Sequence, residues 1–281
     1  MHDQIDSLIA LALAEDIGPG DVTATTVVPA EATATGILLA KQTGVLAGLD
    51  AVARVFRTVD PRIAWEPAMA DGDALTVGAT IGTLAGPARS VLTAERTALN
   101  LLQRLSGVAT TTRHFVDSVT GTGATIVDTR KTTPGMRVLE KSAVRAGGGS
   151  NHRVGLYDGV LIKDNHLAAV GCDIALAVRR ARADAPHTLR VEIEIVDLAQ
   201  LEPAIAAGAD IVMLDNMDVG TMREAVARTG GRVLLEASGG VRLETVRAIA
   251  ETGVDLISVG ALTHSAPALD ISLELDVASV G

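Results

Sequence analysis

From residue 124 onward the chain repeats one unit, a short apolar strand that ends in polar residues and is followed by an amphipathic helix. Six such strands can be marked, at 124–128, 157–162, 189–195, 210–214, 232–237 and 255–259. Helices are expected between them, at 136–146, 173–183, 198–207, 218–229 and 242–252. Strands that alternate with helices in this way predict parallel βα units rather than a meander of antiparallel strands.

The polar residues that close or follow these strands bear on the choice between a barrel and an open doubly wound sheet. In a βα barrel the carboxyl ends of all strands meet on one face, where active sites are built, whereas an open sheet spreads them along a row. Polar groups of complementary chemistry occur at 129–131, 163–166, 194, 215–216, 238–240 and 260. We therefore favour a barrel, complete or incomplete, for this part of the chain.

The first 90 residues have a different pattern. A helix with one apolar face is expected over MHDQIDSLIALALAEDIG and another over 49–56, and glycine-punctuated alternating runs such as DALTVGATIGTLAG predict antiparallel strands packed on a helix. Residues 90–119 predict a long helix that leads into the second part of the chain. A length of 281 residues accommodates two ordinary domains.

The composition excludes several classes of function. Aromatic residues make up only 1% of the chain and the formal net charge is −10, so neither the stacking platforms nor the positive field of a nucleic-acid-binding protein is expected. Cys172 is the only cysteine, which excludes an intrachain disulfide and a thiolate metal cluster and fits a reducing compartment. The sequence has no apolar run of membrane-spanning length and no basic leader at its start. We expect a cytoplasmic protein without membrane or nucleic-acid partners.

Positive charge gathers between residues 128 and 166 of this otherwise acidic chain, which predicts an anion site. Arg130, Arg153 and Lys163 come from different loops yet are expected to face one cavity, and guanidinium groups suit bidentate recognition of planar carboxylates. Two carboxylates on a small ring would account for this set. For His152, donation to a carboxylate and satisfaction of a turn both remain open. A solvated helix face is equally open for three further cations at helical spacing, namely Arg137, Lys141 and Arg145.

Acidic residues and glycine-rich loops close the later strands. Glu192 and Glu194 point to the same face of one strand and Asp215 ends the next, so buried carboxylates converge there and need a metal, ribose hydroxyls or a core cation as partners. Mg²⁺ with a polyphosphate is the usual combination, and pairing with a core cation is the alternative for Glu192. The segments EASGGV (236–241) and SVGAL (258–262) predict a phosphate site built from backbone N–H groups, although such glycines also serve as helix caps.

Seven motifs in a fixed order carry a family resemblance: EDIGPGDVT (15–23), ERTALNLLQRLSG (95–107), DTRKTTPG (128–135), GGGSNHRVGLYDGVLIKDNH (147–166), MLDNM (213–217), EASGG (236–240) and SVGALTHS (258–265). In these motifs the chain resembles the quinolinate phosphoribosyltransferases, also called carboxylating nicotinate-nucleotide pyrophosphorylases. The resemblance implies an α/β protein with a mixed sandwich domain at 1–108 and an incomplete, seven-stranded βα barrel at 109–281, the type II phosphoribosyltransferase architecture. It also implies a homodimer, or a higher oligomer, with active sites shared between subunits.

The resemblance implies the roles of individual residues as well. Arg130, His152, Arg153 and Lys163 match positions that hold quinolinate, and Arg96 matches one that reaches in from the neighbouring subunit. Thr132 is a further expected substrate-binding residue, and His264 is expected close to the donor site. The positions that match those serving the phosphoribosyl donor and its Mg²⁺ are Lys131, Glu194, Asp215, Ser238, Gly239, Gly240, Gly260, Ala261 and Leu262. Among these, Glu194 and Asp215 are the expected metal ligands. One departure is Ser142, where the family resemblance leads us to expect an aromatic residue.

The implied reaction joins quinolinate to phosphoribosyl pyrophosphate and yields nicotinate mononucleotide, pyrophosphate and CO2 in NAD synthesis. It requires no protein nucleophile, because the ring nitrogen attacks the anomeric carbon as pyrophosphate leaves. Lys131, Lys163, Glu194 and Asp215 are the expected catalytic residues, with the cations opposing the leaving group and the developing carbanion and the acids favouring the positive ribose. Two alternatives are a phosphoribosyltransferase for nicotinate or another ring acid and a ligand-binding paralogue without catalysis.

Overall fold

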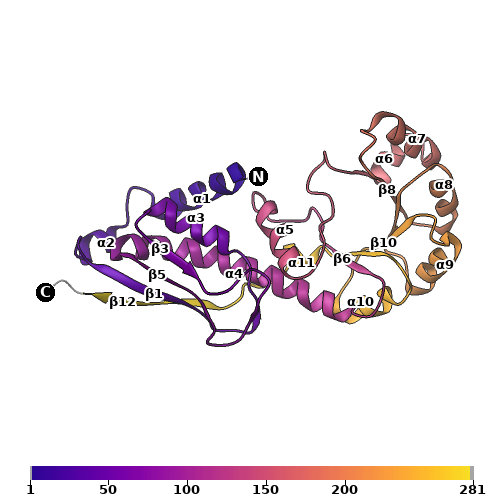
Figure 1. Cartoon of the computed structure of the whole chain (residues 1–281). Helices are drawn as coiled ribbons and strands as arrows, with labels where there is room; N and C mark the ends of the chain where they lie inside the picture. Colours follow the sequence, from indigo (N-terminus) through magenta and orange to yellow (C-terminus); the bar gives the residue numbers. More distant parts are fainter. Residues whose placement is uncertain (1, 279–281) are drawn as a thin grey trace. The chain divides into compact units, whose positions relative to one another are not determined.

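The computed structural model describes residues 2–278 and divides into two compact units (Figure 1). Unit 1 comprises Met1–Arg113, Thr132–Gly148 and Leu262–Gly281, and unit 2 comprises His114–Lys131 and Gly149–Ala261. Each unit is therefore assembled from segments that are separated in the sequence. None of the helices within the described residues is long and apolar enough to span a membrane.

Unit 1 is built on an antiparallel sheet with the strand order β12-β1-β5-β3. Its strands are β1 (Thr33–Ala40), β3 (Ala64–Pro67), β5 (Thr80–Pro87) and β12 (Ile271–Ala278), and a separate pair is formed by β2 (Gly44–Val45) and β4 (Ala74–Leu75). The alternating burial along β1 puts one side of each pleat into the core. The prediction of antiparallel strands is confirmed. β12 was not predicted, and it pairs with β1 although the two strands are far apart in the sequence.

Helices supply the rest of the core of unit 1. They are α1 (His2–Ile17), α2 (Val22–Val27), α3 (Leu49–Val59), α5 (Arg137–Ala146) and the first part of α4 (Ala88–Ser118). Phe56 of α3 packs against Trp65 of β3 with ring centroids 5.8 Å apart. Ser142 of α5 lies at a cavity of about 260 Å³ that Ile5, Leu105 and Val138 also line, so the position where an aromatic was expected borders unfilled space.

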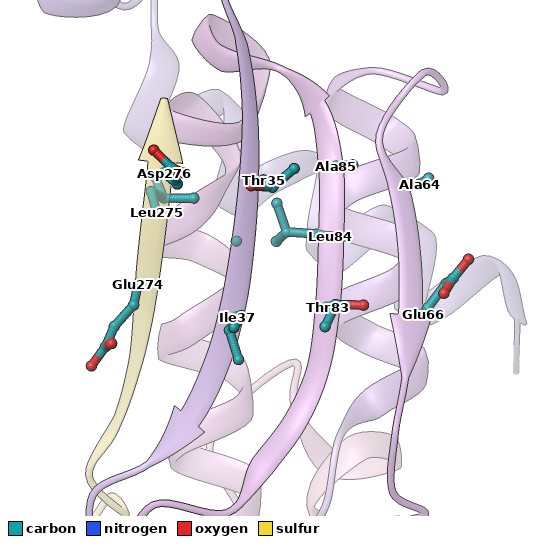
Figure 2. Close-up of a pocket in the computed structure, with 11 residues that line it drawn as sticks. Thr35, Ile37, Ala64, Glu66, Thr83, Leu84, Ala85, Glu274, Leu275 and Asp276 are labelled. Carbon is teal, nitrogen blue, oxygen red and sulfur yellow. The ribbon is translucent and has the colours of Figure 1, made fainter. Parts of the chain in front are cut away.

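One face of the unit 1 sheet is left uncovered by the other elements of this unit and carries a cavity of about 630 Å³. Figure 2 shows its wall, with Thr35, Ile37 and Thr83 in the middle and Glu274 and Asp276 at one side. Gly36 lies beneath it, and a Cβ atom there would come within 2.6 Å of Leu275 Cδ2. The absence of a side chain at Gly36 thus lets the Leu275 side chain lie across the neighbouring strand.

Unit 2 is a parallel sheet with the order β6-β11-β10-β9-β8-β7. The strands are β6 (Thr125–Val127), β7 (Val160–Ile162), β8 (Val191–Ile195), β9 (Ile211–Asp215), β10 (Leu234–Ser238) and β11 (Leu256–Ser258), each overlapping a strand marked in the sequence. The intervening helices are α7 (Ile174–Asp184), α8 (Leu201–Ala206), α9 (Val219–Thr229) and α10 (Leu243–Ala250), with a short α6 (Asp164–Ala168), a 3-10 turn η1 (Leu198–Gln200) and, after β11, α11 (Ala261–His264). The predicted βα alternation is confirmed.

A seventh strand position is reduced to a single residue. Ser150 forms an isolated parallel bridge with Val127, in which the Ser150 N–H donates to the Ile126 carbonyl at 2.9 Å and the Asp128 N–H donates to the Ser150 carbonyl at 3.1 Å. This places the segment after Gly149 at the free edge of β6. The arrangement corresponds to the incomplete barrel that the resemblance implies, with six strands of ordinary length and one residue in the seventh position.

Aspartates begin several of the helices in unit 2. The carboxylates of Asp173, Asp197 and Asp218 accept backbone N–H groups at the starts of α7, η1 and α9, respectively. Such caps satisfy amide groups that have no partner within the helix and fix where the chain leaves each strand-to-helix loop. The loops at the carboxyl ends of the strands are therefore held at both ends.

Candidate active site

A cavity of about 390 Å³ lies at the carboxyl ends of the strands of unit 2. Four cations and two histidines from three separate segments line it, together with one acid and with apolar and hydroxyl side chains: Thr129, Arg130, Lys131, His152, Arg153, Leu156, Leu161, Lys163, His166, Met213, Glu236, Ser238 and Ser258. The expectation that Arg130, Arg153 and Lys163 face one cavity agrees with this lining. Burial and the nearby charge of Arg130 lower the pKa of the Arg153 guanidinium from its ordinary value, which shows how closely the cations are packed.

Lys163 forms an ion pair with Glu194 at the rim of this cavity. Lys163 follows β7 directly, and its backbone N–H donates to His166 Nδ1 at 3.0 Å, which fixes the start of α6. Glu194 comes from β8, and its side chain is only 10% exposed whereas that of Lys163 is 45% exposed. The pair therefore holds a flexible ammonium group in place and leaves part of it open to the cavity.

Asp128 fixes the segment that carries His152. The buried Asp128 carboxylate accepts the Asn151 side-chain amide at 2.7 Å and the His152 N–H at 2.9 Å. The His152 ring then accepts the Arg153 N–H at Nδ1, at 2.7 Å, and lies with Nε2 2.9 Å from Glu192 Oε2. Nδ1 is thus an acceptor and Nε2 carries the proton. The His152 ring thus accepts a backbone N–H in this turn, and its contact with a carboxylate of the substrate stays a prediction.

Glu192 and Glu236 form a buried carboxylate pair around the His152 ring. Glu192 is 4% exposed and its Oε2 lies 2.9 Å from His152 Nε2, whereas Glu236 is 0% exposed and lies 3.7 Å from the same nitrogen. Pairing of Glu192 with a core cation stays a prediction. Burial, followed by the charge of Glu192, raises the pKa of Glu236 to about 7. Glu236 was not predicted as a site residue, although its spacing of two from Ser238 places both on the same side of β10.

Ligand atoms of His152, Glu192 and Glu236 lie within 4.8 Å of one another. Among the described residues this group has the spacing nearest to that of a metal site, but a proton on Glu236, whose pKa is raised to about 7, removes one of the two acidic charges, and Arg153 lies near the other, on Glu192. We interpret the group as a proton-sharing cluster. The expected Mg²⁺ ligands, Glu194 and Asp215, are separate from it.

The loops after β9 and β10 pack closely on each other. The Asn216 N–H donates to the Ser238 carbonyl at 2.9 Å, and the Asn216 side-chain amide donates to Asp215 Oδ2 at 2.7 Å. Asn216, Gly239 and Gly240 all have positive φ values, of 53°, 95° and 60°, and a Cβ atom on Gly239 would lie 2.3 Å from Asn216 Oδ1. Glycine at 239 is therefore required by both backbone conformation and space, and the loop leaves N–H groups accessible before α10 begins.

Four of the expected site residues belong to unit 1. Arg96 is exposed on α4, the Thr132 hydroxyl accepts a hydrogen bond from Arg137 Nε at 3.0 Å, Leu262 is buried, and His264 Nδ1 lies 2.6 Å from the Ser265 hydroxyl. Gly260 and Ala261 follow β11 in unit 2. The assignments of these residues to substrate binding stay predictions.

A buried ion pair that was not predicted from the sequence joins the helices α4 and α5. Arg104 donates from Nε and Nη2 to Glu140 Oε1, at 3.2 and 2.9 Å, and also to the carbonyl groups of Thr263 and Ala266. Glu140, which is 0% exposed, accepts the Thr133 N–H at 3.0 Å and the Thr133 hydroxyl at 2.8 Å. This cluster, the Arg104–Glu140 pair with its bonded groups, anchors the chain next to Lys131 and next to Leu262.

The neighbouring cations on α5 differ in their surroundings. Lys141 is 2% exposed, so the interpretation of Lys141 as a solvated helix-face residue is wrong. Arg137 is half-buried and Arg145 is exposed, and neither lines the cavity at the strand ends. Helical spacing alone could not distinguish these cases, because adjacent turns of one helix pack on different neighbours.

Comparison with known proteins gives a consistent result. The family models for the N-terminal and C-terminal domains of quinolinate phosphoribosyl transferase match residues 21–106 and 108–274. A carboxylating nicotinate-nucleotide pyrophosphorylase of Mycobacterium leprae is 46% identical, over 97% of this chain and 98% of its own length, and a probable one of Bacillus subtilis is 45% identical, over 99% and 96%. The solved nicotinate-nucleotide pyrophosphorylase of Francisella tularensis aligns with a TM-score of 0.92 at 42% identity, over 98% of this chain and 97% of that one. The chain belongs to the quinolinate phosphoribosyl transferase family.

Proposed function

We propose that this chain transfers the phosphoribosyl group of phosphoribosyl pyrophosphate to quinolinate, with decarboxylation, to give nicotinate mononucleotide, pyrophosphate and CO2 in NAD biosynthesis. The observation that carries the proposal is the cavity lined by Arg130, Lys131, Arg153 and Lys163 in a chain with a formal net charge of −10. Such a concentration of cations favours a small substrate with more than one negative group.

The dicarboxylate site is assigned to Arg130, Arg153 and Lys163. Two guanidinium groups can each bind a carboxylate through paired N–H donors, and the ammonium group can oppose charge that develops on the ring carbon when CO2 leaves. The apolar side chains that line the cavity, Leu156, Leu161 and Met213, would contact the flat ring. His152 serves this site through Glu192 and the Arg153 backbone, because its ring nitrogens are engaged there.

The donor side is assigned to Lys131, Ser238, Gly239 and Gly240, with Thr132, Gly260, Ala261, Leu262 and His264 as further donor-binding residues. Glu194 and Asp215 offer carboxylate oxygens, which are the ligands Mg²⁺ prefers, and each is bonded by a single group that a cation could displace or supplement. Bound Mg²⁺ would neutralise charge on the pyrophosphate leaving group. Alanine at either acid should then weaken the dependence of activity on Mg²⁺, and variants with full activity and an unaltered Mg²⁺ requirement would contradict the assignment.

We further propose a homodimer in a cytoplasmic, reducing environment. Arg96 is exposed on α4 and would enter the site of a second copy, and the single cysteine, Cys172, is exposed and free. Mixing an Arg96→Ala variant with a variant inactive at Lys131 should restore part of the activity if each site combines residues from two copies. No restored activity in a mixture with confirmed subunit exchange would contradict a shared site.

A pyrophosphate-release assay with two acceptors tests the function. We expect release with quinolinate and phosphoribosyl pyrophosphate, accompanied by CO2, and none above background with nicotinate. Preference for nicotinate would indicate a phosphoribosyltransferase for a ring monocarboxylate. Binding of either ligand without release of pyrophosphate would indicate a non-catalytic paralogue.

A further inference from the structure

The buried acid Glu236 has no role in the reaction as described so far. Its side chain lines the cationic cavity and also a second cavity of about 510 Å³ within the same unit. The second cavity is lined by residues at the amino ends of strands, among them Thr125, Val160 and Ile211. Glu236 therefore lies inside the incomplete barrel, between the substrate cavity and a polar space on the opposite side.

The surroundings of Glu236 favour a protonated carboxyl group. The residue is 0% exposed, and neither carboxylate oxygen has a hydrogen-bond partner among the described residues. Glu192 Oε1, close by, has none either. Two ionised carboxylates in such a place would have one close donor between them, His152 Nε2 at Glu192 Oε2, to offset the loss of hydration, whereas a shared or bound proton removes one of the charges.

The groups that face Glu236 from each neighbouring element explain its affinity for a proton. Glu192 on β8 raises the pKa of Glu236 together with burial, whereas His152, the Ser258 hydroxyl of β11 and Lys163 after β7 lower it, with a net value of about 7. An anionic substrate in the same cavity adds negative charge, so binding should favour the protonated form further. Glu236 would thus hold a proton when the substrate is bound.

The proposed reaction consumes one proton inside this cavity. When the bond between the ring carbon and its carboxylate breaks, CO2 leaves and the electron pair stays on the ring carbon, which must then form a C–H bond. We propose that Glu236 is the catalytic acid of this step: its carboxyl proton is transferred to the ring carbon, and the carboxylate is reprotonated from solvent through the second cavity. This proposal rests on the proposed function of the chain.

Two other candidates for the acid fit the geometry less well. Lys163 is ion-paired with Glu194, and it stabilises the developing carbanion only while it keeps its positive charge. The His152 proton at Nε2 is directed at Glu192, and Nδ1 accepts a backbone N–H. Glu236 is the remaining titratable group among the described residues that borders both cavities and has a transferable proton.

A single-turnover experiment with Glu236→Gln separates this role from a structural one. Pyrophosphate, CO2 and nicotinate mononucleotide are measured after rapid mixing with quinolinate and phosphoribosyl pyrophosphate. We expect pyrophosphate release close to that of the unchanged protein and mononucleotide formation slower by about 100-fold, the usual size of a general-acid contribution. The proposal would be overturned if Glu236→Gln formed the mononucleotide as fast as the unchanged protein does. It would also be overturned if the variant slowed pyrophosphate release as much as mononucleotide formation.

The pH dependence supplies a second readout. Because the acid must be protonated, mononucleotide formation should fall as pH rises through the pKa of Glu236, and this fall should be absent in Glu236→Gln. Glu192→Gln is the matched control, since it keeps an acceptor for His152 but removes the charge that raises the pKa of Glu236, and the fall should move to lower pH. If the rate of mononucleotide formation fell at the same pH in both variants as in the unchanged protein, the proposal would also be overturned. If the unchanged protein releases neither pyrophosphate nor CO2, the proposed function itself fails, which is a different result.

Discussion

Replacing Glu140 should destabilise unit 1 more than any replacement of an exposed acid. Glu140→Ala removes one member of a buried ion pair and both acceptors of Thr133. Loss of one partner of a buried pair costs about 3–5 kcal/mol, and the lower end is expected here, since the Arg104 side chain is 24% exposed and keeps two carbonyl partners. Glu140→Gln keeps an acceptor for Thr133 and should cost about 1–2 kcal/mol.

Urea unfolding followed by tryptophan fluorescence measures this free energy of unfolding. Trp65 is the only tryptophan and belongs to unit 1, so its signal reports the unit that contains Glu140. The matched control is Glu274→Ala, which removes the partner of Lys41 in an ion pair of the same unit, whose side chains are 59% and 39% exposed, and should change stability by about 0–1 kcal/mol. A loss below about 1 kcal/mol for Glu140→Ala would refute the view that the Arg104–Glu140 pair anchors these segments.

Three further predictions concern the site and the pH dependence of stability. Arg130→Ala should raise the quinolinate KM or abolish turnover, since a charged hydrogen bond of about 1.5–3 kcal/mol is lost. Unchanged quinolinate kinetics would contradict the assignment of Arg130 to the dicarboxylate site. Gly239→Ala should raise the KM for the phosphoribosyl donor, because the new Cβ would meet Asn216 Oδ1 at 2.3 Å, and the quinolinate KM is the comparison that should stay nearly constant. The Arg62 guanidinium, with the Ser90 hydroxyl, holds the pKa of Asp60 well below its usual range, so Asp60 stabilises the fold above the unfolded pKa of about 3.9 and this contribution is lost as pH falls further. The stability difference between the unchanged protein and Asp60→Asn should therefore be constant from about pH 5 to 8 and shrink below about pH 4, whereas a constant difference down to pH 2 would contradict the depressed pKa.

Much of the fold could be predicted because local pattern and tertiary structure agree. The βα alternation from residue 124 gave the strands and helices of unit 2, and polar strand ends indicated where a cavity would lie. β12 was missed although Ile271, Leu273, Leu275 and Val277 alternate with more polar residues, which is the pattern of a half-buried strand. Its pairing with β1, more than two hundred residues away, has no local signal.

The site was predicted less completely, for reasons that differ from residue to residue. Glu236 carries a detectable signal, its position two residues before Ser238 on an inward-facing strand, but its raised pKa depends on Glu192 from another strand. The Arg104–Glu140 pair joins residues 36 positions apart on the helices α4 and α5, and nothing local distinguishes Arg104 from a surface arginine. Arg96 was found only through the family resemblance, because an exposed arginine on a helix has no distinguishing pattern.

The pairing of β12 with β1 has a consequence for how the protein is made. During synthesis β1 leaves the ribosome more than two hundred residues before β12, its hydrogen-bonding partner on one side. All of unit 2 is translated in between, so it can reach its folded state first, while the edge of β1 stays unpaired. The sheet of unit 1 is thus completed only after all of unit 2 has been translated, and nascent chains should depend on protection of the β1 edge until β12 emerges.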